Sequence, residues 1–440
     1  MVTTLVLLTA AVVFGLLAFE PRLRRSSFWR ATVTPLASIM GSGFLVVAPL
    51  LYATVGRYAV IAMAGLLAIA YLLGSVIRYN IRHAEPLLDG HKVAEPTEPR
   101  MHRMTLTFWH TSQKSRSPDL LGMTERTSHI VLAAAYFISV SYYLQLLATF
   151  TLQAIGHTQS QWLIRLIVTG IIAALGIIGT IAGLRAFERM EKYVVALNLG
   201  MIAALLVGLL WHNGQTVAAG QWHLPVRGLT GDGLHAARVL MGMLIVVQGF
   251  ETSRFLGAEH SATERIKSMR RAQWISTGVY LAFIGLVTVM FDAPSASDAT
   301  NVTAIILIAG LVAPVLPALV DVAALGSQFS AATADDAGCA GLLRSMVARF
   351  MPERFAYATV SLVAIAITWA TDVLQIISLA SRAFALYYAI QCAVAVMTAI
   401  RTRCHTDCQK PRVPVPVRIA GFAALGLVAL AVAIFGIPAG

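Results

Sequence analysis

Residues 37–49 have the sequence Ala-Ser-Ile-Met-Gly-Ser-Gly-Phe-Leu-Val-Val-Ala-Pro, in which two glycines flank a serine within an apolar stretch. Glycine destabilises helix interiors and allows the backbone to unwind. A second interruption, Gln-Gly-Phe-Glu-Thr-Ser-Arg-Phe-Leu-Gly at 248–257, places an acid, a base and two glycines in another apolar stretch. Unwound backbone at membrane depth is tolerated only where protein buries it or where it lines a cavity. The glycines at 41 and 43 alone would also fit helix packing, but the pair of interruptions favours two broken helices around a site.

The composition excludes a soluble globular protein. Of the 440 residues, 58% are hydrophobic and 12% are charged, and the mean hydropathy is +0.74. A spanning helix needs about 20 mostly apolar residues. Twelve apolar segments lie near residues 1–19, 33–54, 57–82, 128–154, 162–184, 193–211, 238–257, 273–291, 301–334, 355–371, 372–400 and 418–438. The sequence therefore predicts an all-α polytopic membrane protein with about 12 transmembrane helices.

The two interrupted segments occupy matching positions in two halves of the chain. Residues 33–211 and 238–400 would each hold five helices, beginning with the interrupted one. Because five is an odd number, the second block enters the membrane from the opposite side and the two repeats are inverted. Interrupted helices in matching positions of two halves indicate a transporter binding site. The remaining parts are an extra N-terminal helix with a basic linker at 1–32, an extracellular connection at 212–237, and a cytoplasmic linker with the last helix at 401–440.

The net charge of +12 reflects membrane topology. Of the 33 Lys and Arg residues, 28 lie in alternate connections between the expected helices. Cytoplasmic loops of membrane proteins carry this excess of cations. The distribution places both termini outside the cytoplasm and the polar stretch 83–127 in a cytoplasmic loop, in a protein of the cytoplasmic (inner) membrane. It gives no indication of nucleic-acid binding.

At the two interruptions the chain resembles the amino acid–polyamine–organocation (APC) superfamily. Gly-Ser-Gly-Phe at 41–44, followed by Pro49, resembles the Gly-Ser-Gly-Ile-Phe…Pro signature of that family's first core helix. Gly-Phe-Glu at 249–251, followed by Ala-Glu at 258–259, resembles the Gly-Phe-Glu…Ala-Glu-Glu signature of its sixth. The resemblance implies the LeuT-type fold, a bundle of five plus five helices in inverted repeats.

The chain also departs from that family. Arg-Tyr-Asn-Ile-Arg at 78–82 stands where the second core helix usually ends in an acidic and Pro-Gly-Gly pattern. Asn198 stands where many proton-coupled members carry a lysine, and Arg382 in the tenth core helix is not a common feature. These differences indicate a divergent branch, so the resemblance leaves the substrate and the coupling ion open.

The interruptions predict a substrate site. The N-terminus of a half-helix presents free backbone N–H groups and a positive dipole end, which suit a carboxylate. Unwound carbonyls would face an ammonium group or a cation, and Phe250 is a candidate gate that could equally be a packing residue. The expected substrate-binding residues are Ile39, Met40, Ser42, Gly43, Phe44, Tyr142, Ile245, Gln248, Gly249 and Phe250.

Ionisable side chains within the spans predict coupling or gating. An intramembrane carboxylate such as Glu251 is costly and marks function, either by stabilising the broken helix and taking part in proton coupling, or by pairing with Arg254 one turn away. Arg382 could attract an anionic substrate, pair with Glu251 or lock two helices together. Asn198 completes this set. The acidic pair Asp-Asp at 335–336 is expected at a solvated helix end.

A sodium site of the family type would join the first and eighth core helices. The expected ligands are Ala37 and Met40 on one side and Ser327 and Ser330 on the other. Hydroxyl groups in membrane helices more often bond to their own backbone, so both interpretations stay open.

The leading hypothesis is a secondary active transporter that moves an amino acid or related small amine by alternating access, coupled to protons or sodium. The alternative is a transporter-like membrane sensor that binds a small ligand without moving it. No paired catalytic groups indicate an enzyme, and no cofactor or metal centre is expected. The expected partners are the small-molecule substrate and the lipid bilayer, and the sequence leaves the oligomeric state open.

Overall fold

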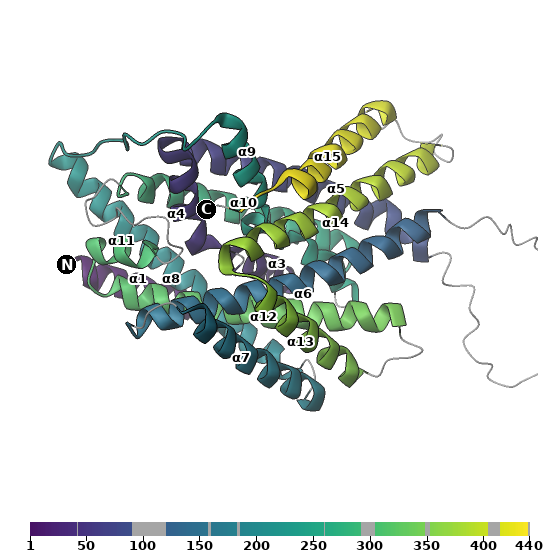
Figure 1. The fold of residues 1–440 in the computed structure, drawn as a ribbon, viewed down its shortest axis with the longest axis horizontal. Coiled ribbons are helices and arrows are strands. Elements are labelled where there is room, and N and C mark those ends of the chain that lie inside the picture. Colours follow the sequence, from purple (N-terminus) through teal and green to yellow (C-terminus); the bar gives the residue numbers. More distant parts are fainter. Residues whose placement is uncertain are drawn as a thin grey trace, which may run out of the picture.

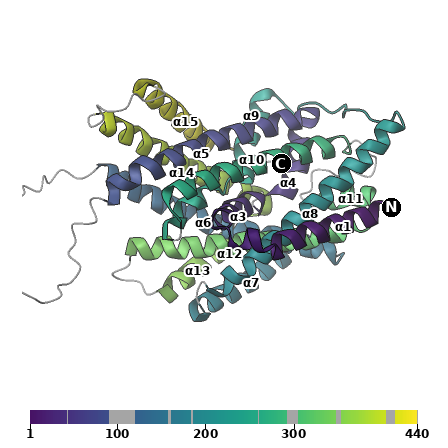
Figure 2. The same ribbon diagram turned by 180° about the vertical axis from the view of Figure 1, so that it is seen from behind.

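The computed structural model describes residues 1–41, 43–89, 120–156, 160–182, 185–258, 260–291, 304–347, 353–403 and 414–438. Within these ranges the chain forms 15 α-helices and three short 3-10 helices, with no strand (Figures 1 and 2). The elements are α1 (Val2–Phe19), α2 (Pro21–Arg25), α3 (Ser27–Gly41), α4 (Phe44–Val55), η1 (Gly56–Tyr58), α5 (Ala59–Asp89), α6 (Leu120–Ala154), α7 (Gln161–Ala182), α8 (Arg185–Ala218), α9 (Gly233–Gly242), η2 (Leu244–Val247), η3 (Phe250–Ala258), α10 (Ala262–Thr288), α11 (Ala304–Val312), α12 (Leu316–Val347), α13 (Glu353–Ala370), α14 (Val373–Arg403) and α15 (Val415–Phe435). The all-helical prediction is confirmed for the described residues.

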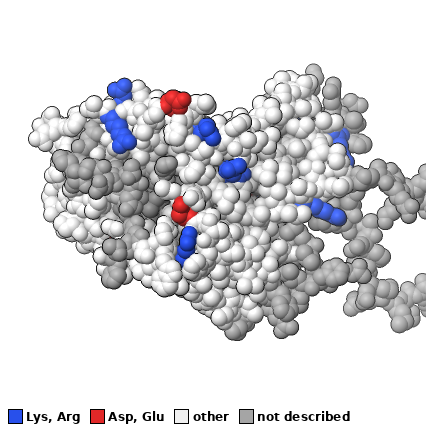
Figure 3. All heavy atoms as spheres, in the orientation of Figure 1, with Lys and Arg blue, Asp and Glu red and all other residues white. Residues whose placement is uncertain are grey.

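Seven helical stretches in the described residues are long and apolar enough to cross a membrane. One of them, Phe44–Leu88, includes α4, the second half of the first broken helix, whereas α3, α9, η2 and η3 belong to none of the seven because each has fewer than 18 residues. The expected count of about 12 spans stays a prediction. Charged side chains are sparse on the face drawn in Figure 3, as a surface in contact with lipid requires.

Both interruptions are breaks in helices. The first break separates α3 from α4, with Gly43 preceding the first residue of α4. The second break, at Gln248 and Gly249, separates η2 from η3. Its flanks are 3-10 rather than α-helical, which is common where a helix is interrupted at a functional position.

Helices from both halves of the chain form the centre of the bundle. Helix α6 packs against α12 and α14, and α3 packs against α10, α12 and η3. Helix α1 packs against α8, and α15 packs against α14. Few residues of α1 and α15 are buried, so these two helices lie at the periphery of the bundle.

One expected segment, 301–334, is divided in the structure. Helix α11 ends at Val312 and α12 begins at Leu316, with Pro314 between them. Proline cannot continue a helix because it lacks the N–H donor and its ring clashes with the preceding turn. Helix α12 then continues to Val347, so the acidic pair at 335–336 lies inside this helix and is buried. The expectation of a solvated helix end was wrong, because the helix extends farther than the apolar run.

The charge pattern predicts opposite sides of the membrane for the N-terminus and for the loop between α5 and α6, and the assignment of the cytoplasmic side stays a prediction. The N-terminus lies at the end opposite to the last residue of α5 and the first residue of α6 (Figure 1). The segment between these two helices was the expected cytoplasmic loop, 83–127, most of which lies outside the described residues.

Candidate functional site

The two breaks touch each other at the centre of the bundle. Gly249 has a positive φ of 113° and lies against α3, where a Cβ atom would be 2.7 Å from the backbone nitrogen of Ile39. Only glycine allows this approach, because a Cβ contact below 3.0 Å forces the neighbouring backbone to move. Tyr280 of α10 joins the two broken segments, since its Oη lies 3.0 Å from the Ile39 carbonyl oxygen and 2.6 Å from that of Val246.

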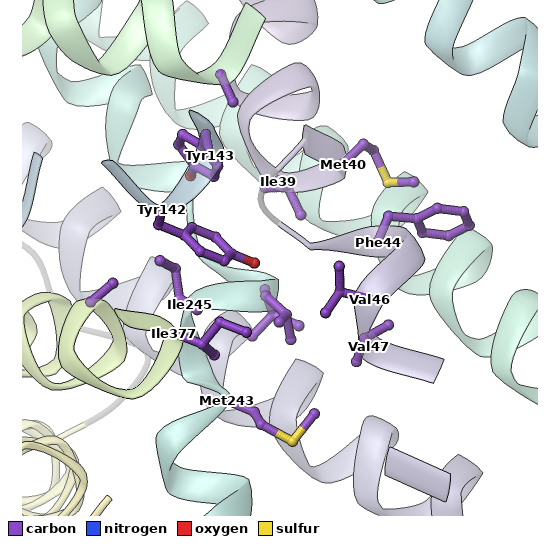
Figure 4. Close-up of a cluster of buried hydrophobic side chains, with 14 of the residues drawn as sticks. Ile39, Met40, Phe44, Val46, Val47, Tyr142, Tyr143, Met243, Ile245 and Ile377 are labelled. Atoms are coloured by element: carbon purple, nitrogen blue, oxygen red, sulfur yellow. The ribbon is translucent and has the colours of Figure 1, made fainter. Parts of the chain in front are cut away.

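Tyr142 of α6 faces the first break. A Cβ atom on Gly43 would lie 3.1 Å from the Tyr142 Oη and 2.8 Å from the Val246 side chain. Figure 4 shows the Tyr142 hydroxyl directed towards this break, whereas the side chains of Met40 and Phe44 point away from it. The Phe44 ring packs on Phe283 instead, with 4.4 Å between centroids. Met40 and Phe44 can therefore contribute backbone groups to the break, while their side chains belong to the core.

Polar contacts hold the second break from two neighbouring helices. Gln248 donates from Nε2 to the Oη of Tyr143, at 3.0 Å, and Ser381 of α14 accepts the Ile245 N–H at 2.8 Å. The expected ligand residue Ser42 lies outside the described residues. The other nine expected substrate-binding residues are buried and lie at the two breaks or on the facing segment of α6.

Glu251 is fully buried and folds back onto the second break. Its Oε2 accepts the Gly249 N–H at 3.0 Å and the Tyr388 hydroxyl at 2.7 Å. The ring of Phe250 stacks on that of Tyr388, with centroids 5.3 Å apart. Phe250 is thus packed against α14.

Two acceptors beside Gly249 have no hydrogen-bond partner in the described structure. They are Oε1 of Gln248 and Oε1 of Glu251, and both side chains are at most 1% exposed. Buried polar groups are normally paired, and an unpaired one calls for an explanation such as a missing ligand or water. Both atoms are acceptors, so a ligand that satisfies them must donate hydrogen bonds or carry positive charge.

Arg254 does not pair with Glu251, which corrects one of the two interpretations of Glu251. Its Nη2 lies 2.9 Å from Oε1 of Glu125 in α6, and its Nε lies 3.6 Å from Glu85 in α5. Arg265 of α10 also binds Glu85, at 2.6 Å, and Gln391 of α14 hydrogen-bonds to both Arg254 and Glu125. Five residues form what we call the Arg254 network, namely Glu85, Glu125, Arg254, Arg265 and Gln391. The network joins α5 and α6 to η3, α10 and α14.

The two other expected coupling residues, Arg382 and Asn198, form no hydrogen bond or ion pair with the residues of the two breaks in the part of the chain that the structure describes. Arg382 is exposed, and its Nε donates to the Ala433 carbonyl of α15 at 2.8 Å. Of the roles left open for Arg382, the structure provides the contact between two helices. Asn198 is buried on α8, whose neighbours include α1 and α12.

The expected sodium ligands come from helices that do meet. A Cβ atom on Gly41 would lie 3.4 Å from the Ser327 carbonyl oxygen, so the end of α3 contacts α12. The Gly41 carbonyl accepts the Gln328 amide at 3.1 Å, and the Ser327 hydroxyl donates to its own helix, at the Ala324 carbonyl. Ala37, Met40 and Ser330 lie on these same two helices.

Sequence reasoning missed several residues of this site. Asp335 is buried on α12, accepts a hydrogen bond from Ser139 of α6, and lies within electrostatic range of Glu251. Tyr280 and Tyr388 were missed as well. The only local signal for Asp335 was a pair of acids next to an apolar run, and nothing local indicated which helix they would face.

The geometry suits a buried, polar-lined binding site between two broken helices. No group of three or more His, Cys, Asp or Glu side chains that could hold a metal ion occurs among the residues that the structure describes. Unpaired acceptors, an acidic side chain and tyrosine hydroxyls could bind a cationic or hydrogen-bond-donating solute, or carry a proton.

Comparison with known proteins identifies the family of this chain and a similar fold. Residues 21–108 and 100–436 match a family described as APC superfamily transporter. A protein of Aquifex aeolicus (strain VF5), itself described as uncharacterized, is 39% identical over 403 residues, which are 91% of each chain. Among solved structures, a mutant of the Eremococcus coleocola manganese transporter is similar, with a TM-score of 0.51 and 14% identity over 92% of this chain and 88% of that one. At that identity the likeness concerns the fold.

Proposed function

Because this chain belongs to the APC superfamily of transporters, we propose that it is a secondary active transporter for an amino acid or related small amine. It is a multi-pass membrane protein, and the charge distribution favours the cytoplasmic (inner) membrane. The proposed architecture is the LeuT-type one, with the repeats 33–211 and 238–400. Its support is that α3–α4 and α9–η3, the first elements of the two repeats, are both broken and touch at their breaks.

The observation that carries the substrate class is the pair of unpaired acceptors at the second break. An ammonium group offers three donors and a positive charge to the Oε1 atoms of Gln248 and Glu251. The first turn of α4 would supply the backbone N–H groups that a substrate carboxylate needs. One broken helix would then bind each end of an amino acid, and a simple amine would use the second break alone.

Coupling to protons or sodium is part of the proposal. Three buried carboxylates (Glu251, Asp335 and Asp336) have no basic partner among the described ion pairs, and isolated charges are strongly disfavoured in such surroundings. Protonation or a bound cation would neutralise them, which favours a cation-coupled cycle. The contact of α3 with α12 at Gly41 and Ser327 keeps sodium as the second candidate ion.

Alternating access requires a closure that can open, and the Arg254 network supplies one. It joins η3, the second half of the broken helix, to α5, α6, α10 and α14. Breaking these contacts would free one side of the site without disturbing the contact between Gly249 and α3. We place this closure on the cytoplasmic side from the distribution of basic residues.

The test is a ligand screen on the purified protein followed by uptake into proteoliposomes. Amino acids, polyamines, small organic anions and Mn²⁺ are compared by thermal unfolding, at two pH values and with or without sodium. A ligand present at about 100 times its dissociation constant adds roughly 2.7 kcal/mol to the free energy of unfolding. We expect an amino acid or an amine to stabilise the wild type and to be taken up when a proton or sodium gradient is imposed.

Matched glycine variants connect the binding to the breaks. Gly43→Ala places a methyl group against Tyr142 and Val246 and should abolish the ligand response, whereas Gly278→Ala on α10 has open space around it and should keep it. Stabilisation without gradient-driven uptake would favour the sensor alternative. Stabilisation only by anions or by Mn²⁺ would refute the proposed substrate class.

A further inference from the structure

A basic groove lies on the outer surface of α10, away from the two breaks. Three cationic side chains and two apolar ones line it from α10, and Phe28 of α3 closes one side, around a volume of about 600 Å³. The α10 residues are Lys267, Arg270, Arg271, Trp274 and Ile275. Their spacing of three and four residues places them on one face of the helix. That face is exposed and is not used by the proposed transport site.

The cations of this groove have no acidic partner among the residues that the structure describes. None of the ion pairs within the described residues involves Lys267, Arg270 or Arg271. The acid closest in sequence, Glu264, caps α10 by accepting the N–H of Ser261. The pKa of Glu264 is lowered by that backbone hydrogen bond first. The Glu264 carboxylate therefore binds the N-terminus of α10 and is not paired with the three cations, so the groove is positively charged.

Two aromatic side chains, Phe28 and Trp274, lie beside the cations of the groove. The Arg271 guanidinium lies 5.0 Å from the centroid of the Phe28 ring. Trp274 is 60% exposed and lies 5.4 Å, centroid to centroid, from Tyr71 of α5. Tryptophan and tyrosine concentrate where the polar and apolar layers of a bilayer meet. The groove therefore changes from cationic to aromatic and apolar within two helical turns, which matches the order of a phospholipid from headgroup to acyl chain.

The groove lies at the end of α10 that begins just after η3. The distribution of basic residues assigns this end to the cytoplasmic leaflet, where anionic lipids attract basic segments. A bound phosphate would contact α10, while the adjoining glycerol and chain would contact Phe28 of α3 and Trp274. Helix α3 leads into the first break and α10 carries Arg265 of the Arg254 network. A lipid bound here would hold together two elements that support the site.

We propose that this groove binds an anionic phospholipid of the cytoplasmic leaflet, with the phosphate between Lys267, Arg270 and Arg271 and an acyl chain along Trp274 and Ile275. Each lysine or arginine near an anionic membrane surface contributes about fivefold to affinity, so removal of three should weaken binding roughly 100-fold.

The experiment measures phosphatidylglycerol binding to the purified full-length protein by native mass spectrometry and by thermal unfolding. Phosphatidylcholine tests whether the headgroup charge matters, and inorganic phosphate tests whether a soluble anion is sufficient. The variant Lys267→Gln/Arg270→Gln/Arg271→Gln is compared with a control that removes three exposed or partly exposed cations from other helices. That control is Arg82→Gln/Arg126→Gln/Arg401→Gln.

We expect phosphatidylglycerol to bind and stabilise the wild type and the control, and to bind the groove variant about 100-fold more weakly. If the groove variant does not fold, Arg271→Gln alone should weaken binding about fivefold and Trp274→Ala should reduce it further. Equal binding to the groove variant and the wild type would overturn the proposal. So would equal responses to phosphatidylcholine, or a response to inorganic phosphate that matches the one to the lipid.

Discussion

Removal of the Glu125 charge tests whether the Arg254 network closes one end of the site. In Glu125→Gln the Arg254 guanidinium loses an ion pair of 2.9 Å, in which the two side chains are only 4% and 8% exposed. Removing one partner of a buried pair costs roughly 3–5 kcal/mol, because an uncompensated charge remains. Arg254 still has Glu85 at 3.6 Å and the amide of Gln391, so we expect the lower end, about 3 kcal/mol.

This loss of free energy destabilises only the closed form, because the Arg254–Glu125 ion pair is already separated in the open form. At about 1.4 kcal/mol for each tenfold change, the equilibrium between closed and open forms shifts by roughly 100-fold. Amide hydrogen exchange measures local opening directly. We expect exchange in 120–130 and 250–258 to accelerate by about that factor, while exchange in α13 stays unchanged.

The matched control is Glu264→Gln. This variant also replaces one glutamate by glutamine, in the first turn of α10, but Glu264 is not part of the Arg254 network. It should leave exchange in both segments at the wild-type rate. If Glu125→Gln also leaves them unchanged, or accelerates exchange uniformly over the whole chain, the network is a general stabilising contact and the reasoning about a closure is refuted.

Three further variants test the geometry of the breaks. Gly249→Ala should lower the unfolding temperature strongly and abolish ligand binding, because its methyl group would meet the Ile39 backbone at 2.7 Å; Gly278→Ala, which has open space, should do neither. Tyr388→Phe removes one of the two donors to the Glu251 carboxylate and should lower the free energy of unfolding by about 1–3 kcal/mol. Thermal or denaturant unfolding measures this loss, and an unchanged midpoint would count against the contact. Arg382→Ala should cost about 1 kcal/mol and leave ligand affinity unchanged in a titration, since Arg382 contacts only α15 in the described hydrogen bonds; a large loss of affinity would return it to the site.

Local sequence determined the class of protein and the position of the two breaks. Apolar runs of spanning length are stable in a lipid bilayer, and the Lys and Arg residues between them concentrate in the cytoplasmic loops. A glycine alone does not mark a break, because Gly65 and Gly278 lie inside the helices α5 and α10. Gly43 and Gly249 were identified together with their sequence neighbours, since Gly-Ser-Gly at 41–43 and Gly-Phe-Glu at 249–251 interrupt apolar runs in matching positions of the two halves.

Tertiary structure alone decided which groups meet at those breaks. Glu125, the partner of Arg254, and Tyr280, which joins Ile39 to Val246, come from helices far away in the chain. Asp335 follows an apolar run, and only the packing of α12 on α6 shows that it is buried against Ser139. Local propensity acts over a few residues, whereas such pairs depend on how helices cross and on which face each one buries. The sequence alone therefore located the two breaks, and the packing of the helices selected the side chains that surround them.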